Sequence, residues 1–459
     1  MRTTDNNCGK SLSEIGGEYS DDLAAIANKS LIDLQRDNPD LLVFPQTLGQ
    51  YNDDVEKHHI FSLSDDKLTT YNLMGFVGRN DTRLTISSRF ARDDTHDYFL
   101  HYMLCKVLSL NIVNLKHSAD SEGIQDFLPY LFPAYLKKAL SQGMFKQYRR
   151  NEYNDANVRG VIDVPRHINR NIPFAGNIAY NTREYSYDND MTELVRHTIE
   201  HLGTVPVGNA VLTCDPDTRA DVQKITNAAP SYNKNDRRKI INANRKPLRH
   251  PYFTEYLPLQ RLCLQILMYE KMSFGQDKDK VYGLLFDGAW LWEEYLNTIL
   301  KKDFDHPRNK TREGGCYLFE NFQRIYPDFI SKSDNPKIVA DAKYIPLSGN
   351  REYEEESERA ASIYYKTIMY MYRFSSHNGY LFYPYSGTEK KEPETYKVKD
   401  TEGTLTKLGL AIPQQANNFM AFCTAIEKHE KEFVECSRFR GRARNDAPRP
   451  PTRRFRASC

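Results

Sequence analysis

Short apolar runs alternate with polar residues between positions 41 and 90 of the chain. Asparagine, aspartate and glycine residues separate these runs, a pattern that is typical of strands joined by tight turns. The runs are LLVF, HHIFSLS, YNLMGFVGR and RLTISSRF. Because alternating apolar positions bury one face of a sheet, this region is predicted to be rich in β-structure.

Longer stretches repeat apolar residues at intervals of three and four, which is the spacing of an amphipathic helix. Helices are predicted on this basis at 95–110, 123–142, within 185–203, and at 257–271, 286–302, 357–374 and 413–431. Further strands are predicted at 316–321, 379–383 and 405–412, and a strand–turn–strand segment at 324–344. From residue 286 onward, the order of helices and strands predicts a mixed sheet with helices on its faces.

The 459 residues give room for two or three domains, and the fold class that we expect is α+β or α/β with several domains. The sequence SFGQDKDK interrupts the apolar pattern at 273–280, so a domain boundary is predicted there. The expected parts are, in order, a polar segment at 1–40, a mixed β and helical domain at 41–275, a second domain at 276–436 and a disordered tail at 437–459.

The tail differs from the rest of the chain in charge. It holds eight arginines and one aspartate, a net charge of +7, whereas the whole chain carries only +2. Three prolines and a lack of apolar periodicity predict disorder. The arginines can add nonspecific affinity for phosphate groups, or the tail can be an extension without a role, and the sequence leaves both open.

Composition limits the class of protein further. Hydrophobic residues make up 40% of the chain, and no apolar run is long enough to cross a bilayer. The first residues, MRTTDNNCGKSLSE, do not resemble an export signal. The eight cysteines form no CxxC pair, which argues against a zinc ribbon and for free thiols in a reducing compartment. The chain is therefore expected in the cytoplasm, away from membranes.

The strand–turn–strand segment RIYPDFISKSDNPKIVADAKY carries the candidate chemistry. Asp341 and Lys343 lie two residues apart and share one face of their strand, and a hairpin can bring Asp328 beside them. This is the PD-(D/E)xK pattern of nucleases, in which carboxylates hold Mg²⁺ and a lysine stabilises developing charge. The alternative is a charged hairpin in which Asp341 and Lys343 face solvent. The apolar run IVA before Asp341 favours an interior strand, where unpaired charges are rare.

Three other groups of residues are candidates for function. Glu293 and Glu294 can add an acidic contact to the metal, or can be ordinary residues on a helix surface. Lys366 and Tyr370 lie four residues apart and so share one face of their helix. In the segment 147–171, arginines alternate with tyrosines, which suits binding of nucleic acid but also an ordinary solvated hairpin. The arginines considered there are Arg149, Arg150 and Arg159.

A succession of longer motifs is more specific than any of these groups. In order, the chain carries MGFVG, RLTISSRF, YMLCKVL, RGVID, YDNDMTELVRHTIEHL, HPYFTEYLPLQRL, FDGAWLWEEY, IYPDFI, VADAKY and YYKTIMYMY. Over most of residues 40–435 this succession resembles the McrC family, the nuclease subunit of McrBC-type and LlaJI-like restriction systems. The resemblance implies a partner-binding domain at 41–275 and a restriction-endonuclease-like PD-(D/E)xK domain at 276–436. It also implies a Mg²⁺-dependent DNA endonuclease that acts in antiviral defence.

The resemblance assigns roles to particular residues. Asp328, Asp341 and Glu293 would hold the metal, and together with Lys343 they would form the catalytic group. Lys366 and Tyr370 would contact DNA; they stand where the family usually carries a Gln-xxx-Tyr element. Lys366 departs from that pattern, although a lysine can still reach a DNA phosphate as a point charge.

The resemblance also implies partners. Such a nuclease subunit docks on a hexameric McrB-like AAA+ GTPase, stimulates its GTP hydrolysis and cleaves double-stranded DNA, which can be methylated. Arg149, Arg150 and Arg159 are the candidates for contact with this partner. The chain contains no GxxxxGK[ST] motif, so GTP is expected to bind only to the partner.

Two alternatives stay open at this level. One is a stand-alone PD-(D/E)xK nuclease of DNA repair or defence, and the other is a non-catalytic DNA-binding adaptor. The complete set of Asp328, Asp341 and Lys343 argues against the adaptor.

Overall fold

The computed structural model describes residues 1–38, 41–45, 59–91, 97–107, 128–205, 208–272, 281–307, 316–320, 322–334, 336–347, 356–387 and 391–439. The chain divides into two compact units, Met1–Leu291 with Asn418–Met420 and Trp292–Asn417 with Ala421–Cys459. The domain boundary predicted near residue 275 lies outside the described residues, as does the predicted tail from residue 440 onward. The start of that tail was predicted wrongly, because residues 437–439 form the end of a helix and Ser437 is buried.

A five-stranded sheet in the order β1-β7-β6-β11-β3 is the framework of the first unit. Its strands are β1 (Arg2–Thr4), β3 (Leu41–Phe44), β6 (Leu73–Arg79), β7 (Thr82–Ser87) and β11 (Val281–Asp287). Although β11 is distant in sequence, it pairs antiparallel with β6 and parallel with β3. Gly75 of β6 permits this close approach, because its φ is +137° and a Cβ there would lie 2.0 Å from the Leu284 carbonyl oxygen.

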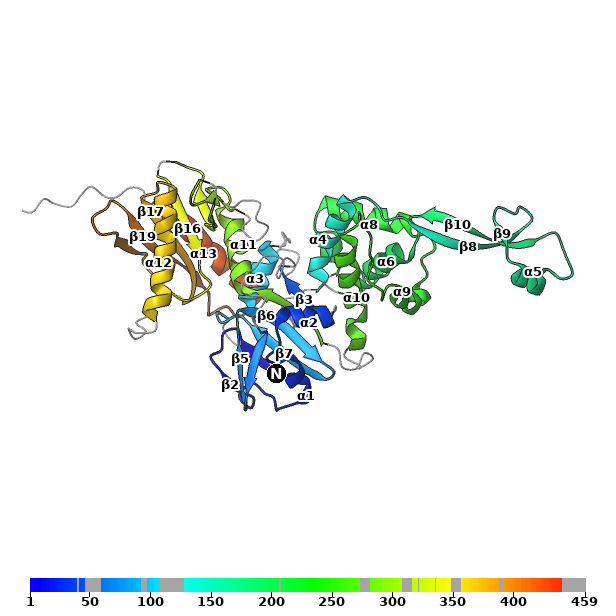
Figure 1. Ribbon diagram of the computed structural model, residues 1–459, viewed down its shortest axis with the longest axis horizontal. Coiled ribbons are helices and arrows are strands. Elements are labelled where there is room, and N and C mark those ends of the chain that lie inside the picture. The colour runs from blue at the N-terminus through cyan, green and yellow to red at the C-terminus, as the bar shows by residue number, and fades with distance from the viewer. Residues whose placement is uncertain are drawn as a thin grey trace, which may run out of the picture. The chain divides into compact units, whose positions relative to one another are not determined.

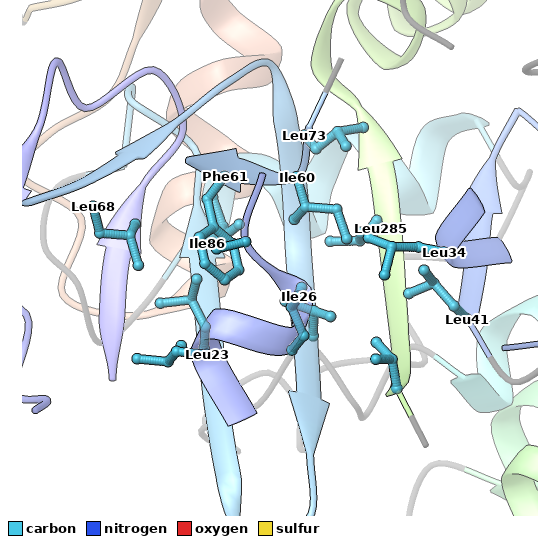
Figure 2. Packing of buried hydrophobic residues seen from close by; sticks show 14 of the residues in the cluster. Leu23, Ile26, Leu34, Leu41, Ile60, Phe61, Leu68, Leu73, Ile86 and Leu285 are labelled. Carbon is cyan, nitrogen blue, oxygen red and sulfur yellow. The ribbon is translucent and has the colours of Figure 1, made fainter. Parts of the chain in front are cut away.

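The core of this unit includes residues 1–38, which the sequence had suggested to be a separate polar segment. They form β1, β2 (Lys10–Ser11), α1 (Asp21–Ile26) and α2 (Leu31–Asp37), and β2 joins a small sheet with β4 (Phe61–Ser64) and β5 (Lys67–Thr70). Figure 2 shows Leu23, Ile26 and Leu34 packed in one apolar cluster with Phe61 and Leu285. Apolar residues near 21–34 fit one amphipathic helix, and the structure has two short helices of six and seven residues there, whose apolar side chains are buried.

A group of helices completes the first unit. It consists of α4 (Leu128–Ser141), α6 (Asp190–Leu202), α7 (Gly208–Leu212), α8 (Pro216–Ala228), α9 (Arg237–Ala243), α10 (Tyr256–Met272) and a 3₁₀ turn at Lys234–Asp236, whereas α3 (Tyr98–Val107) lies apart from this group. The helices predicted within 185–203 and at 257–271 are confirmed. On α6 the predicted apolar stripe, Leu194, Val195, Ile199 and Leu202, is buried.

A long antiparallel ribbon at residues 147–186, which we call the arm, extends from these helices (Figure 1). It is made of β8 (Gln147–Asp155) and β10 (Ile178–Ser186), with β9 (Val161–Ile162) and α5 (Val164–Asn171) at its far end. At its base Asn189 Nδ2 donates to the Phe145 carbonyl oxygen over 3.1 Å, and Arg149 Nη1 lies 2.9 Å from Glu193 Oε1. The sequence did not predict β10, because its residues are mostly polar and partly exposed.

The second unit is built on a six-stranded sheet in the order β12-β15-β16-β17-β19-β18. The strands are β12 (Phe304–Asp305), β15 (Phe329–Ser331), β16 (Ile338–Ala342), β17 (Asn378–Ser386), β18 (Glu394–Lys397) and β19 (Thr404–Ile412). β16, β17 and β19 run parallel, whereas the outer strands pair antiparallel. A separate hairpin is formed by β13 (Cys316–Tyr317) and β14 (Arg324–Ile325). The predicted mixed sheet is confirmed.

Helices cover both faces of this sheet. They are α11 (Gly288–Leu300), α12 (Glu356–Arg373) and α13 (Phe419–Phe439), and α12 crosses over between β16 and β17 (Figure 1). Residues on opposite faces of β17 contact different helices. A Cβ atom at Gly379 would contact Met371 of α12, whereas the ring centroid of Phe382 lies 5.2 Å from that of Phe433 on α13. Across the described residues, none of the helices has both the length and the apolar character needed to cross a membrane.

Strand β11 explains why the first unit reaches Leu291, beyond the boundary suggested by composition. The polar stretch at 273–280 resembles a linker, but β11 directly after it returns to the N-terminal sheet. A single strand that pairs with residues two hundred positions earlier leaves no local signal of its partner. The second unit therefore begins within α11.

Leu285→Ala tests the assignment of β11 to the N-terminal core. Leu285 is fully buried, so its truncation is expected to lower the free energy of unfolding of the first unit by about 2–5 kcal/mol. The control Ile32→Ala, on the exposed side of α2, is expected to lower it by less than about 1 kcal/mol. Chemical denaturation measures both, and equal losses would contradict the assignment.

Candidate active site

Asp341 lies near the end of the interior strand β16, and its side chain is completely buried. Burying a carboxylate is costly unless charged or hydrogen-bonding groups face it. Two ammonium groups do so: Lys343 forms an ion pair with Asp341 Oδ2, and Lys366 Nζ lies 3.3 Å from Oδ1. The alternative in which Asp341 faces solvent is therefore wrong.

The pairing of β15 with β16 brings Asp328 beside this cluster. Asp328 directly precedes β15, which runs antiparallel to β16. Its Oδ2 accepts a hydrogen bond over 2.8 Å from the backbone nitrogen of Ala342, the residue after Asp341. The structure thus brings together Asp328, Asp341 and Lys343 from two neighbouring strands.

The two carboxyl groups differ in their affinity for a proton. Burial raises the pKa of Asp328 well above its ordinary value, and the charges of Asp341 and Glu293 raise it further. Burial also opposes ionisation of Asp341, but the ammonium groups of Lys343 and Lys366 outweigh burial and hold the pKa of Asp341 below its ordinary value. Two buried carboxylates this close resist ionising together. The pair therefore favours a bound proton, or a cation in its place.

Helix α12 contributes Lys366 and Tyr370 to the same side of the sheet. Burial lowers the pKa of Lys366, but Asp341 and Asp328 outweigh that effect and raise it above its ordinary value. Tyr370 is buried, its ring centroid lies 5.5 Å from Lys366 Nζ, and its hydroxyl donates to the Tyr326 carbonyl oxygen over 3.0 Å. Burial raises the pKa of Tyr370 to about 12, so it remains a neutral donor that fixes the chain just before Asp328.

Helix α11 supplies two adjacent glutamates with different surroundings. Glu293 is close enough for its charge to raise the pKa of Asp328. Glu294 Oε1 lies 3.8 Å from Nε2 of His306, whose Nδ1 lies 2.7 Å from the Asp328 carbonyl oxygen. The His306 ring also stacks on Phe329, with centroids 5.0 Å apart. Sequence reasoning missed His306, because no local motif links it to Asp328.

The donor set suits a magnesium ion in part. Asp328 and Asp341 offer the carboxylate oxygens that Mg²⁺ prefers. Among the described residues, the ammonium of Lys343 already pairs with the buried Asp341 Oδ2, so a metal ion bound there would share this oxygen with that lysine. Within the same residues, no three His, Cys, Asp or Glu side chains gather into a complete metal site. The residues therefore fit an ion held by one or two carboxylates and completed by water and a substrate phosphate.

The arginines considered for partner contact lie in the first unit and do not form one cluster. Arg149 pairs with Glu193 at the base of the arm, which gives it a structural role. The Arg150 side chain is 67% exposed. Arg159 is also exposed, and its Nε donates to the Tyr180 hydroxyl over 3.4 Å.

Sequence reasoning also missed an apolar surface at the far end of the arm. Six large apolar side chains between residues 161 and 174 are exposed there, Val161, Ile162, Val164, Ile168, Ile172 and Phe174. Their run VIDVPRHINRNIPF was visible in the sequence, but spacing alone does not separate a docking surface from a buried face.

The sequence model of the family described as "McrBC 5-methylcytosine restriction system component" matches residues 68–384, which include every residue of the candidate active site. The chain belongs to this family, as the succession of motifs had indicated. No match to a curated protein was found.

The solved structures that resemble the chain include two assemblies of McrB and McrC proteins. One is a refined half-complex from a tetradecameric assembly of Thermococcus gammatolerans McrB AAA+ hexamers with bound McrC, at 14% identity and a TM-score of 0.49, covering 95% of this chain and 99% of that one. The other is the cryo-EM structure of the Thermococcus gammatolerans McrBC complex, at 15% identity and a TM-score of 0.31, covering 66% of this chain and 87% of that one.

The raised pKa of Asp328 predicts that stability depends on pH. At pH values above about 4, Asp328 has lost its proton in the unfolded chain but keeps it in the folded one. The free energy of unfolding therefore falls as the pH rises from about 4 through the folded-state pKa. Asp328→Asn cannot ionise and keeps an oxygen for the Ala342 nitrogen. In metal-free buffer this variant should be more stable than the wild type at about pH 8. The difference should be about 1.4 kcal/mol for each unit by which the pKa of Asp328 is higher in the folded state than in the unfolded state, and it should vanish near pH 4.

Denaturation at a series of pH values with a chelator present measures this difference. Asp334→Asn is the matched control, since the Asp334 side chain is 91% exposed, and it should show no such pH dependence. A difference between Asp328→Asn and the wild type that stays constant with pH would contradict the buried, protonated carboxyl group.

Proposed function

We propose that the chain is a Mg²⁺-dependent DNA endonuclease of the PD-(D/E)xK type, the nuclease subunit of an McrBC-type restriction system. The observation that carries this proposal is the meeting of Asp328, Asp341 and Lys343 on the side of β16 that faces α12. Family membership supports it, because a restriction system requires a component that cuts DNA. The buried charges support it too, since groups with strongly perturbed pKa values concentrate at functional sites.

Each residue of the candidate active site has its own role in the proposed hydrolysis of DNA. Asp328 and Asp341 would hold the ion, with Glu293 acting through water. Mg²⁺ bound there would polarise the phosphodiester and lower the pKa of a bound water. Lys343 orients the attacking water and stabilises the negative charge that develops on the phosphate. The water oxygen forms a new bond to phosphorus and gives up a proton, while the bond from phosphorus to the leaving sugar oxygen breaks and that oxygen takes up a proton from solvent. Lys366 binds a neighbouring DNA phosphate.

Asp341→Ala and Lys343→Ala are expected to lower DNA cleavage by at least about 100-fold, because each removes a charge needed in the transition state. Binding to the partner should survive in both variants. The control Lys332→Ala removes a half-exposed lysine from the same hairpin and should cleave normally. Full cleavage by either active-site variant, or by the wild type in the presence of a chelator, would refute the site.

The proposed partner is an McrB-like AAA+ GTPase hexamer, which the chain would bind through its first unit and stimulate. The far end of the arm supports this, because it exposes a group of apolar side chains, and monomeric proteins seldom expose large apolar patches without a partner. Arg150 and Arg159 on the arm are exposed and can add polar contacts. GTP would act only through the partner.

Val161→Ser combined with Phe174→Ser is expected to weaken binding of the GTPase partner by at least about 10-fold, since both side chains are more than half exposed on the arm. Stimulated GTP hydrolysis and DNA cleavage should fall with it. The control Tyr396→Ala changes an exposed aromatic of the second unit and should bind the partner normally. Pull-down and GTPase assays measure these effects, and unchanged binding would contradict the proposed role of the arm.

DNA cleavage by the chain without a partner would favour a stand-alone nuclease.

A further inference from the structure

The hairpin of β13 and β14 is fixed to α12, the helix that carries Lys366. Leu318 and Ile325 pack with Met371 of α12 in one apolar cluster. Arg373 Nε of α12 also donates to the Tyr317 carbonyl oxygen over 2.6 Å. These contacts use the inner side of the hairpin, so the residues that alternate with them face outward.

Two phenylalanines stand exposed at the turn of this hairpin. Phe319 is 52% exposed and Phe322 is 65% exposed, and their rings stack with centroids 4.6 Å apart and planes 18° from parallel. Two backbone hydrogen bonds hold the turn, Leu318 N to Gln323 O at 2.8 Å and Phe319 N to Phe322 O at 3.3 Å. Leaving large rings in water forgoes hydrophobic stabilisation, so this exposed stacked pair is a candidate contact surface.

Cationic and aromatic side chains continue from this pair toward the active site. Arg324 lies over the ring of Tyr317, 5.4 Å from its centroid. Lys366 and Arg373 are seven residues apart and share one face of α12. Tyr372, beside Arg373, is 88% exposed. Arginine and lysine interleaved with exposed aromatic rings form a surface suited to nucleic acid.

The pair also lies within reach of DNA held for cleavage. Phe322 precedes Asp328 by six residues, and a fully extended chain of that length spans at most about 20 Å. Since each base pair of a duplex adds about 3.4 Å, the rings lie within roughly six base pairs of the metal-binding aspartate.

We propose that Phe319 and Phe322 form a base-stacking wedge, which presses against or between bases of the DNA close to the cleaved phosphate. Arg324 and Arg373 contact the DNA backbone on either side. Exposed aromatic rings stack on bases of any sequence, and apolar wedges unstack a base step and bend the duplex. A protein surface would also accept two apolar rings, but the cationic neighbours and the continuity with the active site favour DNA. This inference rests on the proposed DNA cleavage.

The test uses the full chain with its GTPase partner and duplexes that carry 2-aminopurine at successive positions around the cut site. Ca²⁺ replaces Mg²⁺ so that DNA binds without being cleaved. The wild type should raise 2-aminopurine fluorescence at one position, which reports an unstacked base. Phe319→Ala with Phe322→Ala should abolish this rise and weaken DNA binding by about 10-fold or more, while stimulated GTP hydrolysis without DNA is unchanged.

A matched variant separates stacking from folding. Phe319→Tyr with Phe322→Tyr keeps both rings and should retain the fluorescence rise. An alanine variant with wild-type fluorescence and wild-type DNA affinity overturns the wedge while leaving the nuclease in place. Loss of partner binding with unchanged DNA affinity also overturns it, and would assign the rings to a protein interface. Failure of the wild type to cleave DNA with partner, GTP and Mg²⁺ would overturn the proposed function itself.

Discussion

The second unit must stabilise a carboxylate group that is buried in an interior strand. Asp341 has no access to water, and its charge is opposed by Lys343 from the end of its own strand and by Lys366 from α12. Removing ions from water costs several kcal/mol each, and a well-packed apolar residue at such a place is often as stable or more so. Keeping these charges together gives up stability, which is typical of functional sites and supports the nuclease role that we propose.

The surrounding structure holds this cluster from several directions. The crossover between β16 and β17 places α12 over the strand and brings Lys366 to Asp341, while Tyr370 and His306 fix the backbone on either side of Asp328. The same helix anchors the β13–β14 hairpin. One helix therefore links the candidate metal site to the surface that we propose for DNA. The arm belongs to the first unit and is not part of this site; its exposed apolar surface lies at its far end.

Local patterns in the sequence predicted most helices, the mixed sheet of the second unit and the placing of Asp341 and Lys343 on one face, because these depend on spacing along a single element. Contacts between distant segments left no such signal. Strand β11 joins a sheet whose other strands come much earlier in the chain, and His306 meets Asp328 only after folding. The pairing of Lys366 with Asp341 likewise required the crossover that places α12.

The central claim is that Asp328 and Asp341 form a pair that holds either a proton or a divalent cation. Calorimetric titration of the chain with Mg²⁺, repeated in buffers of different ionisation enthalpy, measures metal binding and proton release together. Near neutral pH the account predicts one bound ion and release of up to about one proton, with both lost in Asp341→Asn. Magnesium binding that persists in Asp341→Asn, or that releases no proton at any pH, would contradict it.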